Sequence, residues 1–338
     1  ALISSLNSLG LKKGDEVIVP DETFVATANA VLLNGAIPVL ADIEDVGYNV
    51  SVESIEKSIT KKTKVIMPVH IAGKACDIIK IKKLGNDHNL KIIEDCAHAI
   101  GTKINGRHVG TFGDLGCFSF YPTKNMTTIE GGMVITNSKK LATNIFAYRN
   151  HGFVINKKFK SKPWKYDVEL PGYNFRLDEI RSALGITQLK KIQKQNILRK
   201  KACQYYNLKL KNIKGIETPI LSKSNDDVNH LYMIRIKKEF GISRDKLFRE
   251  FLKSGIQTSL HYVPLHEFTL FKKAAKKYVS LKNSKILYDE LLSLPMFPYI
   301  SKKEQPFISR LFTTDTSLLQ LVVATPLISA LLQTTEYA

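Results

Sequence analysis

Short apolar segments alternate with segments of helical pattern in the first 95 residues. The apolar segments are Glu16–Pro20, Ile37–Ala41, Lys64–Val69 and Lys91–Glu94, and the helical patterns cover Ala26–Leu33, a stretch that begins at Ser51, and Asp77–His88. Continuous apolar strands separated by helices predict a mainly parallel sheet covered on both faces. In such sheets ligands bind at the carboxyl ends of the strands, so residues that follow a strand are the first candidates for a functional site.

The second half of the chain has a different pattern. Two further strands are expected at Gly116–Tyr121 and Gly132–Thr136, and a long helix at Leu177–Lys211. The remainder predicts a smaller α+β domain with strands at Leu231–Ile236 and Gln257–Tyr262 and helices at Ser243–Ser254 and Ser284–Leu292. We therefore expect a large domain over residues 1–195, a small domain over 196–312, and an atypical apolar tail over 313–338.

Composition restricts the class of protein. Of 338 residues, 44% are hydrophobic and 24% charged, which is typical of a globular protein. The four cysteines are widely spaced without a CxxC pattern, so no disulfide framework or zinc site is expected, and a cytoplasmic location fits best. Pro326 interrupts the apolar tail, which therefore predicts a buried or interfacial segment rather than a membrane span.

The net charge of +19 leaves two interpretations open. The lysines are scattered along the chain and no nucleic-acid-binding motif is present, so a solvated surface is the simpler explanation and no nucleic-acid partner is expected. The alternative is attraction of an anionic substrate such as a nucleotide diphosphate. The histidines lack HExxH or similar spacings, and we predict no metal site.

A lysine and an aspartate stand where strands end. Asp95 directly follows the segment Lys91–Glu94, and Lys124 lies in the connection between the two strands that follow. Pyridoxal phosphate requires such a pair. A lysine amine forms a Schiff base with the cofactor, and a carboxylate keeps the pyridine nitrogen protonated so that the ring can accept electrons from a carbanion. Either residue alone would be read as a surface lysine or a turn aspartate.

A series of short segments carries a resemblance to a known family. In chain order they include Gly14–Ile18, Thr23–Thr27, Glu94–His98, Phe118–Phe120, Lys124–Asn125, Glu130–Met133, Arg149–Gly152, Gly172–Leu177, His261–His266 and Leu292–Pro295. Each is unspecific by itself, but the ordered set resembles the DegT/DnrJ/StrS family of pyridoxal-phosphate-dependent sugar aminotransferases over about residues 1–311. The resemblance implies an aspartate-aminotransferase-type fold (fold type I), with a mainly parallel large domain and a smaller α+β domain.

The resemblance also implies roles for individual residues. Lys124 would bind the cofactor covalently and act as the catalytic base, while Asp95 would pair with the pyridine nitrogen. Phe24 would stack on the ring, since a flat aromatic suits a flat conjugated group. Ser119 would bind the phosphate. His98 would contact the ring oxygen, although a buried histidine that is satisfied by its surroundings is the alternative.

Further roles involve the substrate and a second subunit. Asn174 would reach the cofactor phosphate of the partner, so that the site is shared within a homodimer. Arg176 is a candidate for the substrate diphosphate. His261 and His266 either line the substrate pocket or pack between the domains. The implied reaction transfers an amino group, usually from glutamate, to a nucleotide-linked keto-sugar, giving an amino sugar for surface polysaccharide or glycoconjugate synthesis.

Two alternatives remain. A sugar dehydratase on the same fold would carry histidine in place of Lys124, which argues against that reaction. The second is an impaired or non-catalytic fragment. The chain begins downstream of the small-residue motif that binds the phosphate in the family, and beyond about Phe312 it departs from the family pattern. Under this alternative, the chain binds the cofactor poorly or not at all.

Overall fold

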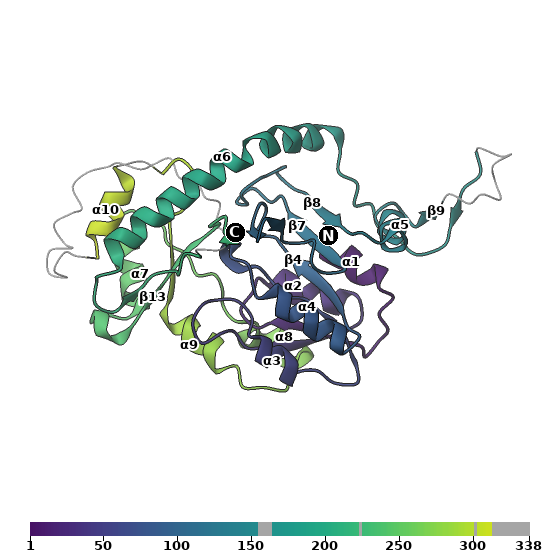
Figure 1. The fold of residues 1–338 in the computed structure, drawn as a ribbon, viewed down its shortest axis with the longest axis horizontal. Coiled ribbons are helices and arrows are strands. Elements are labelled where there is room, and N and C mark those ends of the chain that lie inside the picture. Colours follow the sequence, from purple (N-terminus) through teal and green to yellow (C-terminus); the bar gives the residue numbers. More distant parts are fainter. Residues whose placement is uncertain (155–163, 223–224, 301–302, 313–338) are drawn as a thin grey trace.

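The computed structural model describes residues 1–154, 164–222, 225–300 and 303–312 (Figure 1). Its centre is a seven-stranded sheet in the order β14-β2-β1-β3-β4-β7-β8, in which only β8 runs antiparallel to its neighbour. The strands are β1 (Glu16–Pro20), β2 (Ile37–Ala41), β3 (Thr63–Ile66), β4 (Lys91–Asp95), β7 (Leu115–Ser119), β8 (Gly132–Ile135) and β14 (Lys276–Lys277). The expected mainly parallel sheet is confirmed.

Helices cover both faces of this sheet. Successive residues of β1 point to opposite faces, and both faces are buried, which explains why the strand is apolar throughout. One face packs against α1 (Leu2–Ser8), α2 (Val25–Leu33), α5 (Lys139–Tyr148) and α8 (Thr269–Ala274), and the other against α3 (Val52–Lys57) and α4 (Ile78–Asp87). Side-chain N-caps fix the starts of α3, α4, α5 and α6, from Ser51, Asp77, Ser138 and Asp178.

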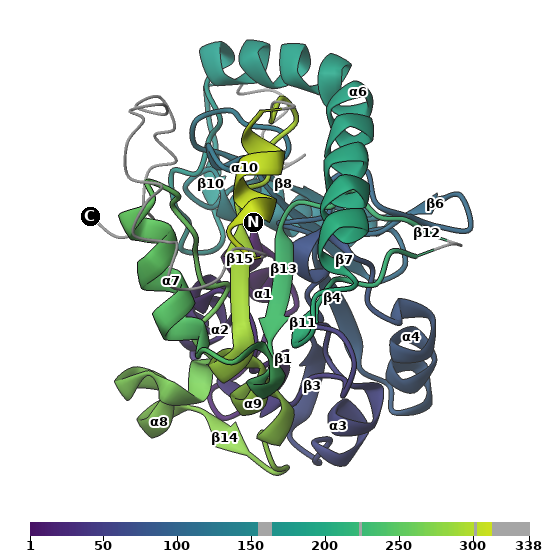
Figure 2. The same ribbon diagram turned by 90° about the vertical axis from the view of Figure 1, so that its left-hand side faces the viewer.

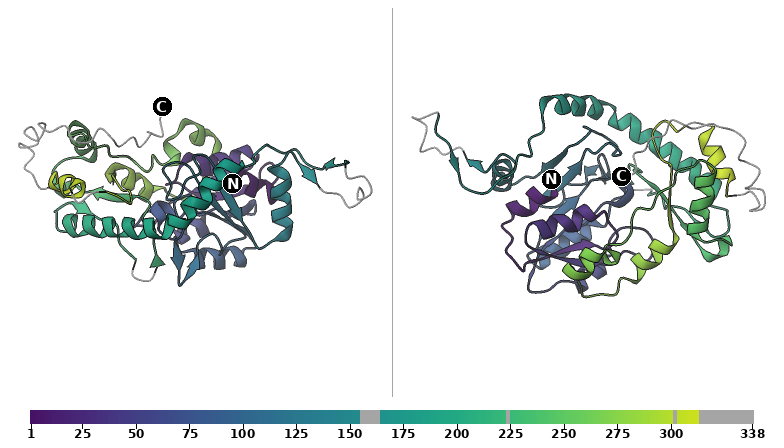
Figure 3. Two further views of the ribbon diagram at one scale, coloured as in Figure 1. Left: turned by 90° about the horizontal axis from the view of Figure 1, so that it is seen from above. Right: turned by 180° about the vertical axis from the view of Figure 1, so that it is seen from behind.

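A single long helix joins the two parts of the molecule. Helix α6 (Glu179–Leu210) runs from the large sheet to a smaller lobe, as Figure 3 shows from above and from behind. The predicted division between residues 195 and 196 falls inside this helix, and β14, far along the chain, joins the large sheet. The domain boundaries stay a prediction, and the tail at 313–338 lies outside the described residues.

The smaller lobe is built on a three-stranded antiparallel sheet. Figure 2 shows β13 and β15 side by side, with α6 and α7 on either side. Its elements are β11 (Ile216–Glu217), β13 (Tyr232–Ile236), β15 (Leu291–Leu294), α7 (Arg244–Lys253), α9 (Lys282–Glu290) and α10 (Glu304–Arg310). The core of this lobe contains Tyr206, Tyr232 and Phe251, all buried.

Short elements complete the description. They are β5 (Lys103–Ile104), β6 (Arg107–His108), β9 (Phe153–Val154), β10 (Asp167–Val168), β12 (Asn225–Asp226) and the single 3-10 turns Ile71–Gly73, Lys238–Phe240 and Leu265–Glu267. No described helix combines the length and the apolar character needed to cross a membrane.

One predicted strand in the small lobe was wrong, and one predicted helix ends two residues earlier than expected. The segment Gln257–Tyr262 is not a strand, because its only ladder contact among the described residues is a single bridge between Ser259 and Ser293. The helix expected over Ser284–Leu292 ends at Glu290, and β15 follows at once. Leu291–Leu294 is a short, fully buried apolar run, and periodicity does not distinguish a helix from a strand in such a run.

Candidate functional site

Three parallel strands end around a cavity of about 600 Å³. Phe24 follows β1, Asp95 ends β4, and Lys124 lies in the loop after β7. Because the carboxyl ends of parallel strands meet at one edge of the sheet, these residues converge although they are far apart in sequence. His98 and Ser119 line the same cavity. The structure therefore brings together five of the six residues that were predicted to serve the cofactor, and Asn174 is the exception.

Asp95 carries the buried negative charge of this cavity. Its side chain accepts a hydrogen bond from the Thr27 hydroxyl at 3.1 Å and one from the Ala97 main-chain N–H at 3.0 Å. Burial raises the pKa of Asp95, and the opposing hydrogen bonds and the charge of Lys124 do not cancel this rise. A carboxylate in this state is stabilised by a cation placed against it. The cavity therefore fits a group with a protonated ring nitrogen.

Both ring nitrogens of His98 are engaged. Nδ1 lies 3.3 Å from the Ala72 main-chain nitrogen, which donates to it, and Nε2 lies 3.0 Å from the Tyr262 hydroxyl. Burial, followed by the charge of Lys124, lowers the pKa of His98 well below its ordinary value, so the ring is neutral. The contact with Tyr262 was not predicted, because the candidates chosen in the segment His261–His266 were its two histidines.

Lys124 also faces a second cavity, of about 780 Å³, on the side of the small lobe. Thr23 and Phe24 line both cavities, and His230, His261 and Tyr262 line the second. Lys124 is the only lysine among its lining residues, which include no arginine, aspartate or glutamate. Two adjoining spaces thus share one amine, an arrangement in which one space can hold a cofactor and the other a substrate.

A hydrogen-bond network fixes the residue that follows Lys124. The Asn125 side chain lies 2.8 Å from His230 Nδ1 through its oxygen and donates to Asn196 Oδ1 at 2.9 Å. Asn196 belongs to α6, and His230 stands just before β13. The loop that carries Lys124 is therefore tied to the long helix and to the small lobe. His230 directly precedes the strand that was expected at Leu231–Ile236, and no motif in the sequence marks it as part of the site.

The histidines around Lys124 are neutral. Burial, followed by nearby positive groups that include Lys124, lowers the pKa of His230 well below its ordinary value and that of His261 to about 4. The rings of His98 and His230 lie 4.6 Å apart between centroids. The site therefore combines one amine, one buried acid and neutral imidazoles.

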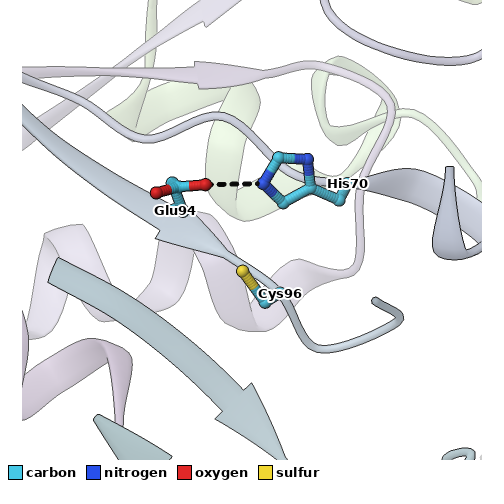
Figure 4. A group of neighbouring side chains, drawn as sticks. All are labelled: His70, Glu94 and Cys96. Carbon is cyan, nitrogen blue, oxygen red and sulfur yellow. Dashed lines mark hydrogen bonds and ion pairs between the residues drawn. The ribbon is translucent and has the colours of Figure 1, made fainter. Parts of the chain in front are cut away.

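Three buried side chains from the segments that end β3 and β4 lie close together, as Figure 4 shows. His70, Glu94 and Cys96 place potential ligand atoms within 4.8 Å of one another. Both Glu94 oxygens, however, accept hydrogen bonds: Oε2 from the Gly110 N–H and His70, and Oε1 from the N–H groups of Phe112 and Gly113. Through these hydrogen bonds Glu94 holds the loop that leads into β7 in place.

Asn174 and Arg176 line neither of the two cavities in this chain. Asn174 forms an isolated bridge with Asn150, and Arg176 donates to Asn150 Oδ1 at 2.8 Å. Phe175, between them, lines the first cavity. The roles predicted for these two residues concern a partner's cofactor and a diphosphate, and they stay predictions.

The structure separates the two histidines of the segment His261–His266. His261 lines the second cavity, and its Nδ1 lies 2.9 Å from the Ser293 hydroxyl. His266 lines neither of the two cavities. Its Nδ1 lies 2.6 Å from Asp21 Oδ2, and its main-chain N–H donates to Asp21 Oδ1. A packing role is the simpler description of His266.

Comparisons with known proteins agree with this geometry. Residues 1–311 match the model of the DegT/DnrJ/EryC1/StrS aminotransferase family. The chain is 37% identical over 279 residues to GDP-perosamine synthase of Vibrio cholerae, covering 82% of this chain and 73% of that protein. It is 36% identical over 307 residues to UDP-N-acetyl-3-dehydro-alpha-D-glucosamine 3-aminotransferase of Acidithiobacillus ferrooxidans, covering 90% and 78%.

A solved structure supports the same conclusion. Spr1654 of Streptococcus pneumoniae, described as a sugar aminotransferase and solved in its PLP form, superposes with a TM-score of 0.85 at 26% identity, covering 95% of this chain and 85% of that one. The resemblance inferred from the sequence and the expected fold are thereby confirmed. The family match spans the residues that line both cavities, and the chain therefore belongs to the DegT/DnrJ/EryC1/StrS aminotransferase family.

Proposed function

We propose that this protein is a pyridoxal-phosphate-dependent aminotransferase that moves an amino group from glutamate to a keto-sugar carried on a nucleotide. The observation that carries the proposal is the placement of Lys124 and Asp95 on the wall of one cavity. The product would be a nucleotide-linked amino sugar for surface polysaccharide or glycoconjugate synthesis.

The residues of the first cavity fit pyridoxal phosphate. When bound, the cofactor supplies an electron-withdrawing ring that stabilises negative charge on the amino-bearing carbon of a substrate. Asp95 would hold the ring nitrogen in its protonated form. Burial raises the pKa of Asp95, and a positively charged ring nitrogen beside it would lower that pKa again. Phe24 would cover a ring face and Ser119 would bind the phosphate, with His98 beside the ring.

Lys124 is the proposed base. Its amine would hold the cofactor covalently between turnovers. Released by an incoming donor amine, it would take a proton from the donor's α-carbon. The neutral His98, His230 and His261 add no further positive charge around this amine. The Asn125 network would keep the loop of Lys124 in place during the exchange.

The substrate class is inferred from relatives. GDP-perosamine synthase and UDP-N-acetyl-3-dehydro-alpha-D-glucosamine 3-aminotransferase are named for nucleotide-linked sugars with different nucleotides. We infer the same general class here. His261 would face the sugar in the second cavity, while Arg176 would serve the diphosphate from the rim. For His266, the Asp21 contact makes a direct substrate role the weaker alternative.

We also infer a homodimer with a shared site. Exposed apolar side chains are concentrated in the segment that leads into α6 and along its first half: Tyr173, Phe175, Ile180, Ile186 and Leu189. Phe175 also lines the first cavity, so this surface adjoins the candidate site. A second copy placed here would cover apolar surface and bring Asn174 towards the partner's cofactor, as the family resemblance implies.

The test uses the cofactor's own absorbance. The full chain is mixed with pyridoxal phosphate, and the visible band of the covalent complex is recorded with Lys124→Ala beside it. Transfer of the amino group from glutamate to nucleotide-linked keto-sugars is then followed. Loss of both band and transfer in the variant is expected. A band that persists in Lys124→Ala would refute the assigned role.

A further inference from the structure

Tyr262 stands at the junction of the two cavities. Its ring centroid lies 5.5 Å from that of Phe24, which lines both, and its hydroxyl lies 3.0 Å from Nε2 of His98, which lines the first. Tyr262 itself lines the second cavity together with Lys124. Its side chain is nevertheless buried, with only 7% of the residue exposed. The phenol therefore borders the cavity that Lys124 faces, and it is shielded from bulk water.

The tautomer of His98 decides how the phenol is used. The Ala72 main-chain N–H donates to Nδ1 of His98, so Nδ1 carries a lone pair and the proton of the neutral ring is on Nε2. That N–H then donates to the Tyr262 oxygen. Because the oxygen accepts from His98, the phenolic proton points away from His98. Neutral His98 thus sets the direction in which Tyr262 donates.

Two of the other buried tyrosines are bonded to the main chain instead. The hydroxyls of Tyr48 and Tyr206 donate to main-chain carbonyl oxygens, of Met233 at 2.5 Å and Pro295 at 3.1 Å, which is the usual way to satisfy a structural phenol. Tyr262 is anchored through its main-chain N–H, which donates to Glu22 Oε1, and through its ring. Its hydroxyl is held by a histidine of the site instead.

We propose that Tyr262 is a further catalytic residue of this site, donating a hydrogen bond to the nitrogen or oxygen atom exchanged at Lys124, and that His98 is a positioning residue that acts through Tyr262. The inference rests on the proposed aminotransferase function. It adds Tyr262 to the residues of the segment His261–His266 that are candidates for direct contact with the reacting groups. One oriented donor next to a reacting atom typically changes the rate about 100-fold.

The experiment compares the full-length wild type with Tyr262→Phe, which removes only the hydroxyl and keeps the ring against Phe24. We expect kcat for amino transfer to fall about 100-fold with little change in KM for the nucleotide sugar. The pH midpoint of the bound cofactor's visible absorbance should also shift, by about one unit, because a hydrogen bond to the titrating atom is lost. A purely structural tyrosine would move neither quantity.

Two further variants complete the design. Tyr278→Phe is the matched control, because it also removes a single phenol. The Tyr278 hydroxyl donates to Glu16 Oε1 at a distance of 2.8 Å, and Tyr278 lines neither cavity. His98→Asn should lower kcat by a smaller factor in the Tyr262→Phe background than in the wild type, because the part of its effect that passes through the phenol is already lost. If Tyr262→Phe has the kinetics of the wild type and an unshifted titration, the role of Tyr262 is overturned while the proposed function stands. A wild type without band or transfer would overturn the proposed function as well.

Discussion

Nε2 of His70 lies 3.1 Å from Oε2 of Glu94, and both side chains are completely buried (Figure 4). The Cys76 main-chain N–H donates to Nδ1 of His70, which places the proton of a neutral ring on Nε2, towards Glu94. The Glu94 carboxylate thus accepts four hydrogen bonds. One comes from the His70 imidazole and three from the main-chain N–H groups of Gly110, Phe112 and Gly113. The pair joins the strand that ends in Asp95 to the loop that enters β7.

Replacing this carboxylate should destabilise the fold. Glu94→Gln puts an amide N–H₂ against main-chain donors, and we expect a loss of about 3 kcal/mol in the free energy of unfolding, measured by urea denaturation. Glu53→Gln is the control. It alters an exposed i,i+4 pair with Lys57, so its effect should stay within about 0.5 kcal/mol.

The loss in Glu94→Gln should depend on pH in a defined direction. Burial alone would raise the pKa of Glu94, but the hydrogen bonds from His70, Gly113 and Gly110 outweigh it and hold the pKa below the ordinary 4.5. A lowered pKa stabilises the fold above the unfolded-state value and ceases to do so as pH falls through the folded-state value. The difference between the variants should therefore be constant at neutral pH and shrink in acid. A difference that is unchanged in acid would contradict this assignment.

Asp95→Asn should show the opposite trend. The pKa of Asp95 is raised by burial, so without cofactor its ionised form costs stability, and the cost grows as pH rises through the folded-state pKa. We expect cofactor-free Asp95→Asn to melt higher than the wild type at pH 8, with a smaller difference at pH 5. With pyridoxal phosphate present the order should reverse, since the variant lacks the charge that the ring nitrogen needs.

The control for this comparison is Asp87→Asn, at an exposed position near the end of α4. It should leave the melting temperature unchanged with and without cofactor. An Asp95→Asn protein that is less stable than the wild type in both states would show that the carboxylate is structural.

The sequence predicted those parts of the fold that depend on local pattern. Strands β1 and β2 appear at the expected residues because apolar runs buried on both faces have few other solutions, and Ser51 starts α3 as its N-cap. The convergence of Asp95 and Lys124 follows from the common edge of parallel strands. The contact between His98 and Tyr262 spans 164 residues and depends on how the small lobe packs. No local pattern specifies such a contact. The sequence therefore predicted His261 and His266 as the pocket residues of this segment and not Tyr262.

The inferred dimer predicts a specific sensitivity. Ile186 is 60% exposed on the first half of α6, where we place the second copy. Ile186→Glu should convert the dimer to a monomer in analytical ultracentrifugation, because a charge would be buried in an apolar contact. Ile79→Glu, at a position 53% exposed on α4, is matched in chemistry and should leave the assembly intact. Equal behaviour of both variants would place the interface elsewhere.

The last prediction separates packing from substrate binding at His266. Its hydrogen bond to Asp21 is the main reason that the pKa of His266 is raised, so the pair stabilises the fold below the unfolded-state pKa of 6.5 and loses this effect as pH rises through the folded-state value. His266→Asn should therefore cost about 2 kcal/mol at pH 6 and less at pH 9 in urea denaturation, as expected for a charged hydrogen bond. His88→Asn, at an exposed position, serves as the control. If His266 packs rather than binds, KM for the nucleotide sugar stays at the wild-type value at pH 8. A rise in KM without a pH-dependent loss of stability would instead place His266 in contact with the substrate.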